Sequence, residues 1–215
     1  MSLEFLDHYS AADVESVARL HENYLADSPV VALGPRFIRQ FYYRKLVQDG
    51  LLGCIVCRAD GRVVGFISYT REPRTFMSLG IHRHFWFLSW VMGVTILTRP
   101  AILKHIWATW RMMGDRARDL HEKPTPGGAE VISMATEKEY LKHVPPGGKS
   151  RVPARLYEKV IEHLRDEGFA RVIFLVQPSN TASNLFFAAT GCEFDKIMIA
   201  GAPVHRYTRH LHDAS

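Results

Sequence analysis

A glycine-rich, basic stretch connects a strand pattern to an amphipathic helix pattern in the second half of this chain. It occupies residues 145–151, reads PPGGKSR, and is followed by a helix pattern that begins at Val152. A helix N-terminus offers unpaired backbone N–H groups and the positive end of the helix dipole to an anion. The two glycines permit dihedrals that point successive amides the same way, and the lysine and arginine add positive charge. The stretch predicts a phosphate or diphosphate site; an ordinary loop with a solvated basic rim is the alternative.

A P-loop is one way to build such a site. The stretch HVPPGGKS, which starts at His143, matches G-x-x-x-x-G-K-[ST] except that histidine replaces the first glycine. That glycine makes the tight turn directly out of the strand, whereas here the charged stretch EKEYLK at 137–142 intervenes. No later apolar strand ends in an aspartate that would help hold magnesium, so the P-loop is the weaker interpretation.

A second polar position follows the next strand pattern. Asn180 comes after VIFLVQ at 172–177 and starts a helix pattern over 181–190. One face of that helix groups Ala182, Leu185, Phe186 and Ala189, and another groups Ser183, Phe187 and Thr190. Such a helix could separate the core from a ligand, with one face toward each. A helix whose polar face is simply solvated would contain the same residues.

In this order, these stretches resemble the GCN5-related N-acetyltransferase (GNAT) superfamily. The family pattern is a strand, an R/Q-x-x-G-x-G/A loop, a helix, a strand, and then Asn-x-x-Ala-x-x-x-Tyr-x-x-x-Gly-Phe. The matching stretches here are EVISMAT, GGKSRVPARLYEKVIEHLRDEGF, RVIFLVQ and NTASNLFFAATGCEF. The resemblance covers residues 130–200, and the helix pair and hairpin of residues 1–70 agree with it in order. It implies that an acetyl group passes from acetyl-CoA to a primary amine by direct attack, without a metal.

The resemblance also implies which residues meet the acyl-CoA. A backbone N–H near the end of the 130–136 strand would polarise the thioester carbonyl, the amides of 147–152 would hold the diphosphate, and Asn180 would contact the pantetheine region or the acyl end. The implied cofactor-binding residues are Met134, Ala135, Thr136, Gly147, Gly148, Lys149, Ser150, Arg151, Val152, Asn180, Ser183 and Phe187.

Several residues depart from the family pattern. The loop positions that usually hold Arg or Gln, Gly, and Gly or Ala fall on Gly148, Arg151 and Pro153, and Ser183 replaces the alanine. Phe187 stands where many members have the tyrosine that protonates the leaving thiolate, and phenylalanine cannot donate a proton. A non-catalytic module that binds acyl-CoA is therefore a competing hypothesis.

A general base must take a proton from the ammonium form of the acceptor. Glu137, just beyond the strand end, is the first candidate, and Glu130, Tyr140 and His143 are weaker ones. Tyr207 is the expected acid in place of the missing tyrosine, with Tyr69 or water as alternatives.

The elements that position these residues alternate along the chain. Strands are expected at 3–6, 52–58, 62–70, 130–136, 171–177, 194–200 and 204–211, and helices at 14–25, 35–49, 81–98, 101–114, 152–164 and 181–190. Asp60-Gly61 predicts a hairpin between the second and third strands. The order predicts a mixed α/β sheet, and the resemblance implies one domain over 1–215 with a GNAT-like α/β fold, in which helices flank a mixed, mostly antiparallel central sheet. A helical insertion at about 71–128 separates the third and fourth strands.

The insertion holds the charge surplus of this 215-residue chain. Its part from Arg71 to Lys123 has nine Lys and Arg against four Asp and Glu, a difference of +5 that equals the net charge of the whole chain. All four tryptophans, at 86, 90, 107 and 110, also lie there. Peripheral membrane contact through 81–113, a lid over the acceptor site, a homodimer surface, and helices packed on the sheet are the alternatives. A nucleic-acid partner is disfavoured, because bulky apolar residues interrupt any basic stripe.

The cysteines and the N-terminus bear on the cellular compartment. Cys54 and Cys57 are an odd number of positions apart in a strand pattern, which points their side chains to opposite faces and argues against a metal or redox pair. The uncharged run from Phe85 to Thr98 has fourteen residues, fewer than the roughly 20 needed to span a bilayer. No secretion signal is apparent at the N-terminus, and a soluble, cytoplasmic protein is expected.

Overall fold

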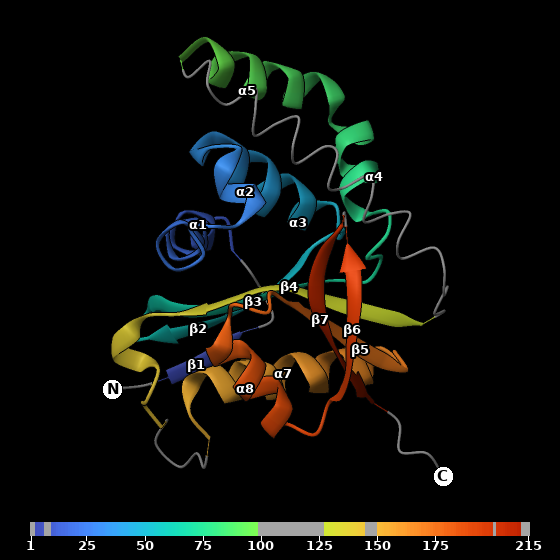
Figure 1. Cartoon of the computed structure of the whole chain (residues 1–215). Helices are drawn as coiled ribbons and strands as arrows, with labels where there is room; N and C mark the ends of the chain where they lie inside the picture. The colour runs from blue at the N-terminus through green and yellow to red at the C-terminus, as the bar shows by residue number, and fades with distance from the viewer. Residues whose placement is uncertain (1–2, 7–9, 99–126, 145–149, 200, 212–215) are drawn as a thin grey trace.

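Seven strands form one sheet in the order β1-β2-β3-β4-β5-β7-β6 (Figure 1). The structure is a computed structural model that describes residues 3–6, 10–98, 127–144, 150–199 and 201–211. The strands are β1 Leu3–Leu6, β2 Gly53–Ala59, β3 Arg62–Thr70, β4 Gly128–Thr136, β5 Arg171–Val176, β6 Glu193–Ile199 and β7 Ala202–His210. Neighbouring strands are antiparallel except β4 and β5, which are parallel. The expected mixed, mostly antiparallel sheet is confirmed.

Helices cover both faces of the sheet. They are α1 Asp13–Tyr24, α2 Pro29–Ala32, the π-helix η1 Phe37–Lys45, α3 Leu46–Gln48, α4 Phe76–Arg83, α5 Phe85–Thr98, the 3-10 helix η2 Lys138–Tyr140, α7 Val152–Asp166 and α8 Thr181–Ala189. Figure 1 shows α1, α2 and α3 on one side of the sheet and α7 and α8 on the other. The helices α4 and α5 lie in the chain between β3 and β4, which confirms the helical insertion. Among the described helices, none is long and apolar enough to cross a bilayer.

The β2–β3 hairpin follows directly from the sequence. Asp60 and Gly61 both have positive φ, 49° and 81°, as a two-residue hairpin turn of type I′ requires. Cys54 belongs to the core under α1 and η1, and Cys57 to the core under α7, so the expected separation of the two thiols is confirmed.

The central strands β2 and β3 are buried on both faces, whereas the edge strand β6 is mostly exposed. The core under α1 and η1 includes Val17, Ile38, Phe41, Tyr43 and Phe66, and the core under α7 includes Ile67, Leu156, Val160, Leu164 and Phe174. Gly65 lets α7 approach β3 closely, because a Cβ there would lie 3.2 Å from Leu156 Cδ1 and 3.1 Å from Thr136 Oγ1. The tight packing fixes the start of α7 next to the end of β4.

The helices that precede β2 differ from the expectation in detail. The short helix α2 was not expected, and the expected helix at 35–49 is a π-helix over the nine residues of η1. Hydrogen bonds that reach five residues back, such as Leu46 N–H to Phe41 O, widen the helix, and Phe41, Tyr42 and Tyr43 are all buried. An apolar period of 3.6 residues does not signal such a widened helix.

The insertion also differs from the expectation. The structure has two helices where one was expected at 81–98. The first, α4, begins at Phe76 and ends before His84, which separates it from α5. The helix expected at 101–114 lies outside the described residues, as do Gly147, Gly148 and Lys149.

Candidate active site

The two central strands separate in the middle of the sheet. Parallel pairing between β4 and β5 runs from Gly128 with Arg171 to Val131 with Phe174 and then stops. Beyond that point, β4 pairs only with β3, and β5 pairs only with β7. The backbone groups on the facing edges of β4 and β5 are therefore available to a ligand that enters between the strands.

A β-bulge lies where the separation begins. Ser133 pairs with Ser68 and Val131 with Tyr69, which leaves Ile132 as the extra residue of β4. The Glu137 N–H donates to Val64 O on β3 at 2.9 Å. Since backbone groups along a strand point alternately to its two sides, the N–H groups of Met134 and Thr136 point away from β3, toward the gap. The N–H of Ala135, also singled out by the sequence, points toward β3.

The start of α7 lies beside the end of β4 and is only partly open. The Val152 N–H donates to His143 O at 3.1 Å, and Pro153 has no N–H to offer. Among the described residues, no acceptor receives the Ala154 N–H, and the exposed Arg151 guanidinium has no acidic partner. The expected donor Val152 is therefore engaged, while Ala154 and Arg151 remain available to an anion.

By sequence, the chain matches no protein-family model and no curated protein. Solved structures match over nearly its whole length. PaiA N-acetyltransferase from Thermoplasma acidophilum in complex with coenzyme A is 11% identical with a TM-score of 0.54, over 98% of this chain and 99% of that one. The aminoglycoside acetyltransferase AAC(6')-Ib in complex with ribostamycin and coenzyme A is 12% identical with a TM-score of 0.61, over 98% and 94%. An N-acetyltransferase from Staphylococcus aureus is 10% identical with a TM-score of 0.58, over 99% and 100%.

This chain has the GNAT fold. The separated strands β4 and β5 correspond to the two strands of the GNAT pattern, at 130–136 and 171–177. The helix α7 begins at the loop-to-helix junction of that pattern. The similarity to these structures is in the path of the backbone, because few side chains are shared at 10–12% identity.

Glu137, the first candidate for the base in this GNAT fold, is held by an arginine. Arg62 Nη1 and Nη2 donate to Glu137 Oε1 and Oε2 at 2.7 and 2.8 Å, a bidentate pair between the start of β3 and the end of β4. Hydrogen bonding to Glu137 is the main reason that the pKa of Arg62 is raised. Each carboxylate oxygen keeps a second lone pair, so Glu137 could accept a hydrogen bond from an acceptor while Arg62 holds it.

The other candidates for the base lie in two places. Glu130 is buried on β4, in register with Ile173 just before the strands separate. Tyr140 and His143 have their rings 6.0 Å apart, in the segment between β4 and α7. Glu130 is therefore the carboxylate that the structure places nearest in register to the separation.

The ring of Tyr207 lies beside Phe187. The two centroids are 5.6 Å apart, and Phe187 also stacks on Phe174 with centroids 4.4 Å apart. Phe187 thus points into the core under α7. On the face of α8 that grouped Leu185, Phe186 also packs against this core, with its ring centroid 5.6 Å from that of Tyr157, whereas Leu185 is exposed. Tyr69, the alternative acid, hydrogen-bonds His163 Nε2 at 2.6 Å under α7, where burial raises the pKa of the phenol to about 12.

Asn184, which the sequence did not single out, joins α8 to its surroundings. Its Nδ2 donates to the carbonyl oxygens of Gln177, Pro178 and Asn180 at 3.0, 3.3 and 2.8 Å. Its Oδ1 lies 2.8 Å from His205 Nδ1 and accepts from the Tyr207 hydroxyl at 3.1 Å. His205 and Tyr207 lie on β7, and Gln177 and Pro178 lie in the turn before α8. Their approach to Asn184 depends on how these elements meet in space, so no spacing in the sequence indicates it.

Asn180 and Ser183 interact at the start of α8. Asn180 Oδ1 accepts from the Ser183 N–H at 3.1 Å and so caps the helix, while its Nδ2 has no acceptor among the described residues. Ser150, expected at the diphosphate, donates its hydroxyl to Glu158 Oε1 at 2.7 Å. Burial would raise the pKa of Glu158, but the hydrogen bonds from Ser150 and Arg155 outweigh it, so the pKa is lowered and the carboxylate is anionic.

Metal ligands are not grouped in the described part of this GNAT fold. No set of three or more His, Cys, Asp or Glu within those ranges could hold a metal ion. The groups that the structure brings together around the separated strands are backbone amides, hydroxyls and amide side chains.

Proposed function

We propose that this protein is an acetyl-CoA-dependent N-acetyltransferase that acetylates a primary amine by direct attack. The separation of β4 from β5 beside the α7 N-terminus is the observation that carries the proposal. Support comes from the shared fold with N-acetyltransferases whose structures contain coenzyme A. The acceptor is a small molecule or a peptide. We place the activity in the cytoplasm, where unpaired cysteines such as Cys54, Cys57 and Cys192 stay reduced.

The backbone of β4 would supply the electrophilic assistance. The N–H groups of Met134 and Thr136 face the gap and can stabilise the negative charge that develops on the carbonyl oxygen during attack. The Thr136 hydroxyl is buried and has no hydrogen-bond partner among the described residues. A buried hydroxyl without a partner is costly, and a polar ligand between the strands would relieve that cost.

The anionic part of the donor would lie at the start of α7. The Ala154 N–H, the positive end of the α7 dipole and the Arg151 guanidinium form the part of this site that the structure describes. Gly147, Gly148, Lys149 and the main-chain amide of Ser150 remain the proposed partners of the diphosphate on the loop side.

Proton transfer completes the proposed reaction. A base accepts the proton that the ammonium acceptor loses, and an acid returns a proton to the sulfur as the carbon–sulfur bond breaks and the carbon–nitrogen bond forms. We propose Glu137, which Arg62 holds in place, as the base, and Tyr207 as the acid.

Thiol release from acetyl-CoA across a panel of amines tests the proposal. We expect acetyl-CoA to bind and at least one amine to release CoA stoichiometrically with an acetylated product. Glu137→Gln should remove the acidic limb of the pH–rate profile, whereas Arg62→Gln, which frees both carboxylate oxygens, should keep that limb. An unchanged profile in Glu137→Gln would eliminate Glu137 as the base. Tight binding without CoA release by any amine would instead favour a non-catalytic acyl-CoA-binding module.

A further inference from the structure

The outer face of α5 is apolar and exposed. The helix has fourteen residues and no charged side chain. Trp86, Trp90 and Leu97 are 84%, 61% and 85% exposed, and their spacing places them on one face of the helix. Leu88 and Val91 on the opposite face are buried, where α5 contacts η1. The packed face already holds α5 in place, so the exposed stripe is available to a partner.

The composition of this stripe fits the boundary between lipid headgroups and acyl chains. Tryptophan is enriched at that boundary because its ring is apolar and its N–H is polar. A helix of fourteen residues is about 21 Å long, which is shorter than the roughly 30 Å of the hydrocarbon core. Because α5 is too short to span the core and one of its faces packs on η1, it would lie in the plane of the interface with its exposed stripe toward the lipid.

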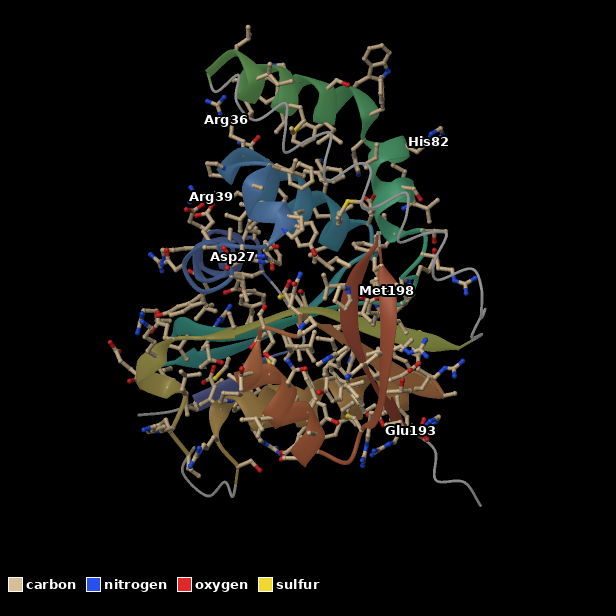
Figure 2. The ribbon with its side chains drawn as sticks, in the orientation of Figure 1. Asp27, Arg36, Arg39, His82, Glu193 and Met198 are labelled. Carbon is tan, nitrogen blue, oxygen red and sulfur yellow. The ribbon has the colours of Figure 1, made fainter. Side chains whose placement is uncertain are left out.

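The charge around α5 complements an anionic surface. Within the described part of the insertion, residues 73–98 contain Arg74 and Arg83 and no Asp or Glu. At the end of α4, His82 and Arg83 are exposed, and Arg36 is exposed on the neighbouring helical layer. Figure 2 shows Arg36 and His82 at the two edges of the layer beneath α5. Asp49 is the acidic group that pairs with this region, through Arg83 at 3.5 Å and His84 at 2.9 Å, and its side chain is largely buried.

The position of α5 is compatible with function at a membrane. Figure 1 shows α5 at the opposite end of the molecule from α7 and α8. With α5 on a membrane, the start of α7 would remain in water, where a soluble anionic donor could reach it. The inference does not depend on the proposed reaction.

We propose that α5 is an interfacial helix that docks this protein on an anionic lipid surface through Trp86, Trp90 and Leu97. The exposed basic groups at the end of α4 and at Arg36 attract the protein to the surface, and the exposed stripe enters the headgroup region. Burying one tryptophan side chain contributes on the order of 2 kcal/mol, which is roughly thirtyfold in the partition coefficient.

Flotation of the full chain with vesicles tests this proposal. We expect the protein to float with phosphatidylcholine vesicles that contain phosphatidylglycerol at low salt, and much less with phosphatidylcholine alone or at high salt. The double variant Trp86→Ser, Trp90→Ser should lose at least about tenfold in partitioning. Leu185→Ser, which removes an equally exposed apolar side chain from α8 at the other end of the molecule, should float like the wild type.

Three results would overturn the proposal. They are a wild-type protein that stays unbound at low salt, a double variant that floats as well as the wild type, and self-association that the double variant abolishes without any vesicle binding. The last result would assign the stripe to a second copy of this chain. Circular dichroism and acetyl-CoA binding measured on the same samples separate a folding defect, or a failure of the proposed activity, from a loss of docking.

Discussion

At the scale of single residues, the exchange of a tyrosine for Phe187 raises the question of how the leaving thiolate is protonated. The structure offers a specific answer, because the ring of Tyr207 lies against Phe187 with centroids 5.6 Å apart. Its hydroxyl is held by Asn184 Oδ1 at 3.1 Å. The hydroxyl of Tyr207 on β7 could therefore serve as the acid in place of the tyrosine that α8 lacks.

Tyr207→Phe tests this replacement. We expect kcat to fall by roughly ten- to a hundredfold, at the low end for general acid catalysis because a thiolate leaves readily, and the alkaline limb of the pH–rate profile to flatten. Tyr69→Phe removes a phenol that is bound to His163 under α7 and should leave the shape of the profile unchanged. A Tyr207→Phe enzyme with the wild-type rate and profile would show that water supplies the proton.

At the scale of elements, the turn between β5 and α8 depends on one side chain. Asn184 bonds three carbonyl oxygens of residues 177–180 and also contacts His205 and Tyr207 on β7. The turn presents Asn180, which the GNAT resemblance implies at the pantetheine region or the acyl end of the donor. Asn184 therefore acts as a positioning residue, because it acts through Asn180 and Tyr207.

Asn184→Ala should weaken acetyl-CoA binding more than it slows acetyl transfer at saturation. The carbonyl groups of residues 177–180 are exposed and can bond water instead, so each lost hydrogen bond contributes about 0.5–1.5 kcal/mol, and we expect roughly a two- to tenfold rise in the Kd for acetyl-CoA measured by calorimetry. Leu185→Ala changes the next, exposed residue of α8 and serves as the matched control. Equal Kd values for the two variants would remove Asn184 from this role.

At the scale of the whole molecule, stability should depend on pH through His21. The imidazole is fully buried under η1, with Nδ1 2.6 Å from the Tyr43 hydroxyl, and burial lowers its pKa to about 4. In the unfolded chain the pKa is about 6.5, so below that pH the unfolded state binds more protons than the folded state. This group therefore lowers the free energy of unfolding as the pH falls from about 6.5 to about 4, by roughly 3 kcal/mol in total.

Urea unfolding of the wild type and of His21→Phe between pH 7.5 and 4.5 measures this contribution. The variant loses the bond to Tyr43 and should be less stable at neutral pH, but its stability should fall less steeply with acid. His82→Gln, at an exposed position on α4, should keep the wild-type slope. Parallel curves for the wild type and His21→Phe would contradict the buried neutral histidine.

The sequence alone predicted the order of the seven strands and of the described helices other than α2 and η2. Local patterns were sufficient for this: Asp60-Gly61 for the hairpin, the alternation that separates Cys54 from Cys57, and the apolar stripe that begins at Val152. Each reflects backbone preference or burial over a few neighbouring residues, which a sequence records directly. The break at His84 and the π-helix η1 were missed because packing against other elements decides them.

Only the tertiary structure decided which groups at the site are engaged. Arg62 holds Glu137 across 75 positions, and the His143 carbonyl occupies the Val152 N–H. Asn184 meets Tyr207 across 23 positions. These pairs depend on strand register, on the bulge at Ile132 and on how closely α7 approaches β3. A hydrogen bond requires atoms to meet within about 3 Å in a fixed geometry, and spacing along the chain does not specify that approach once the partners belong to different elements.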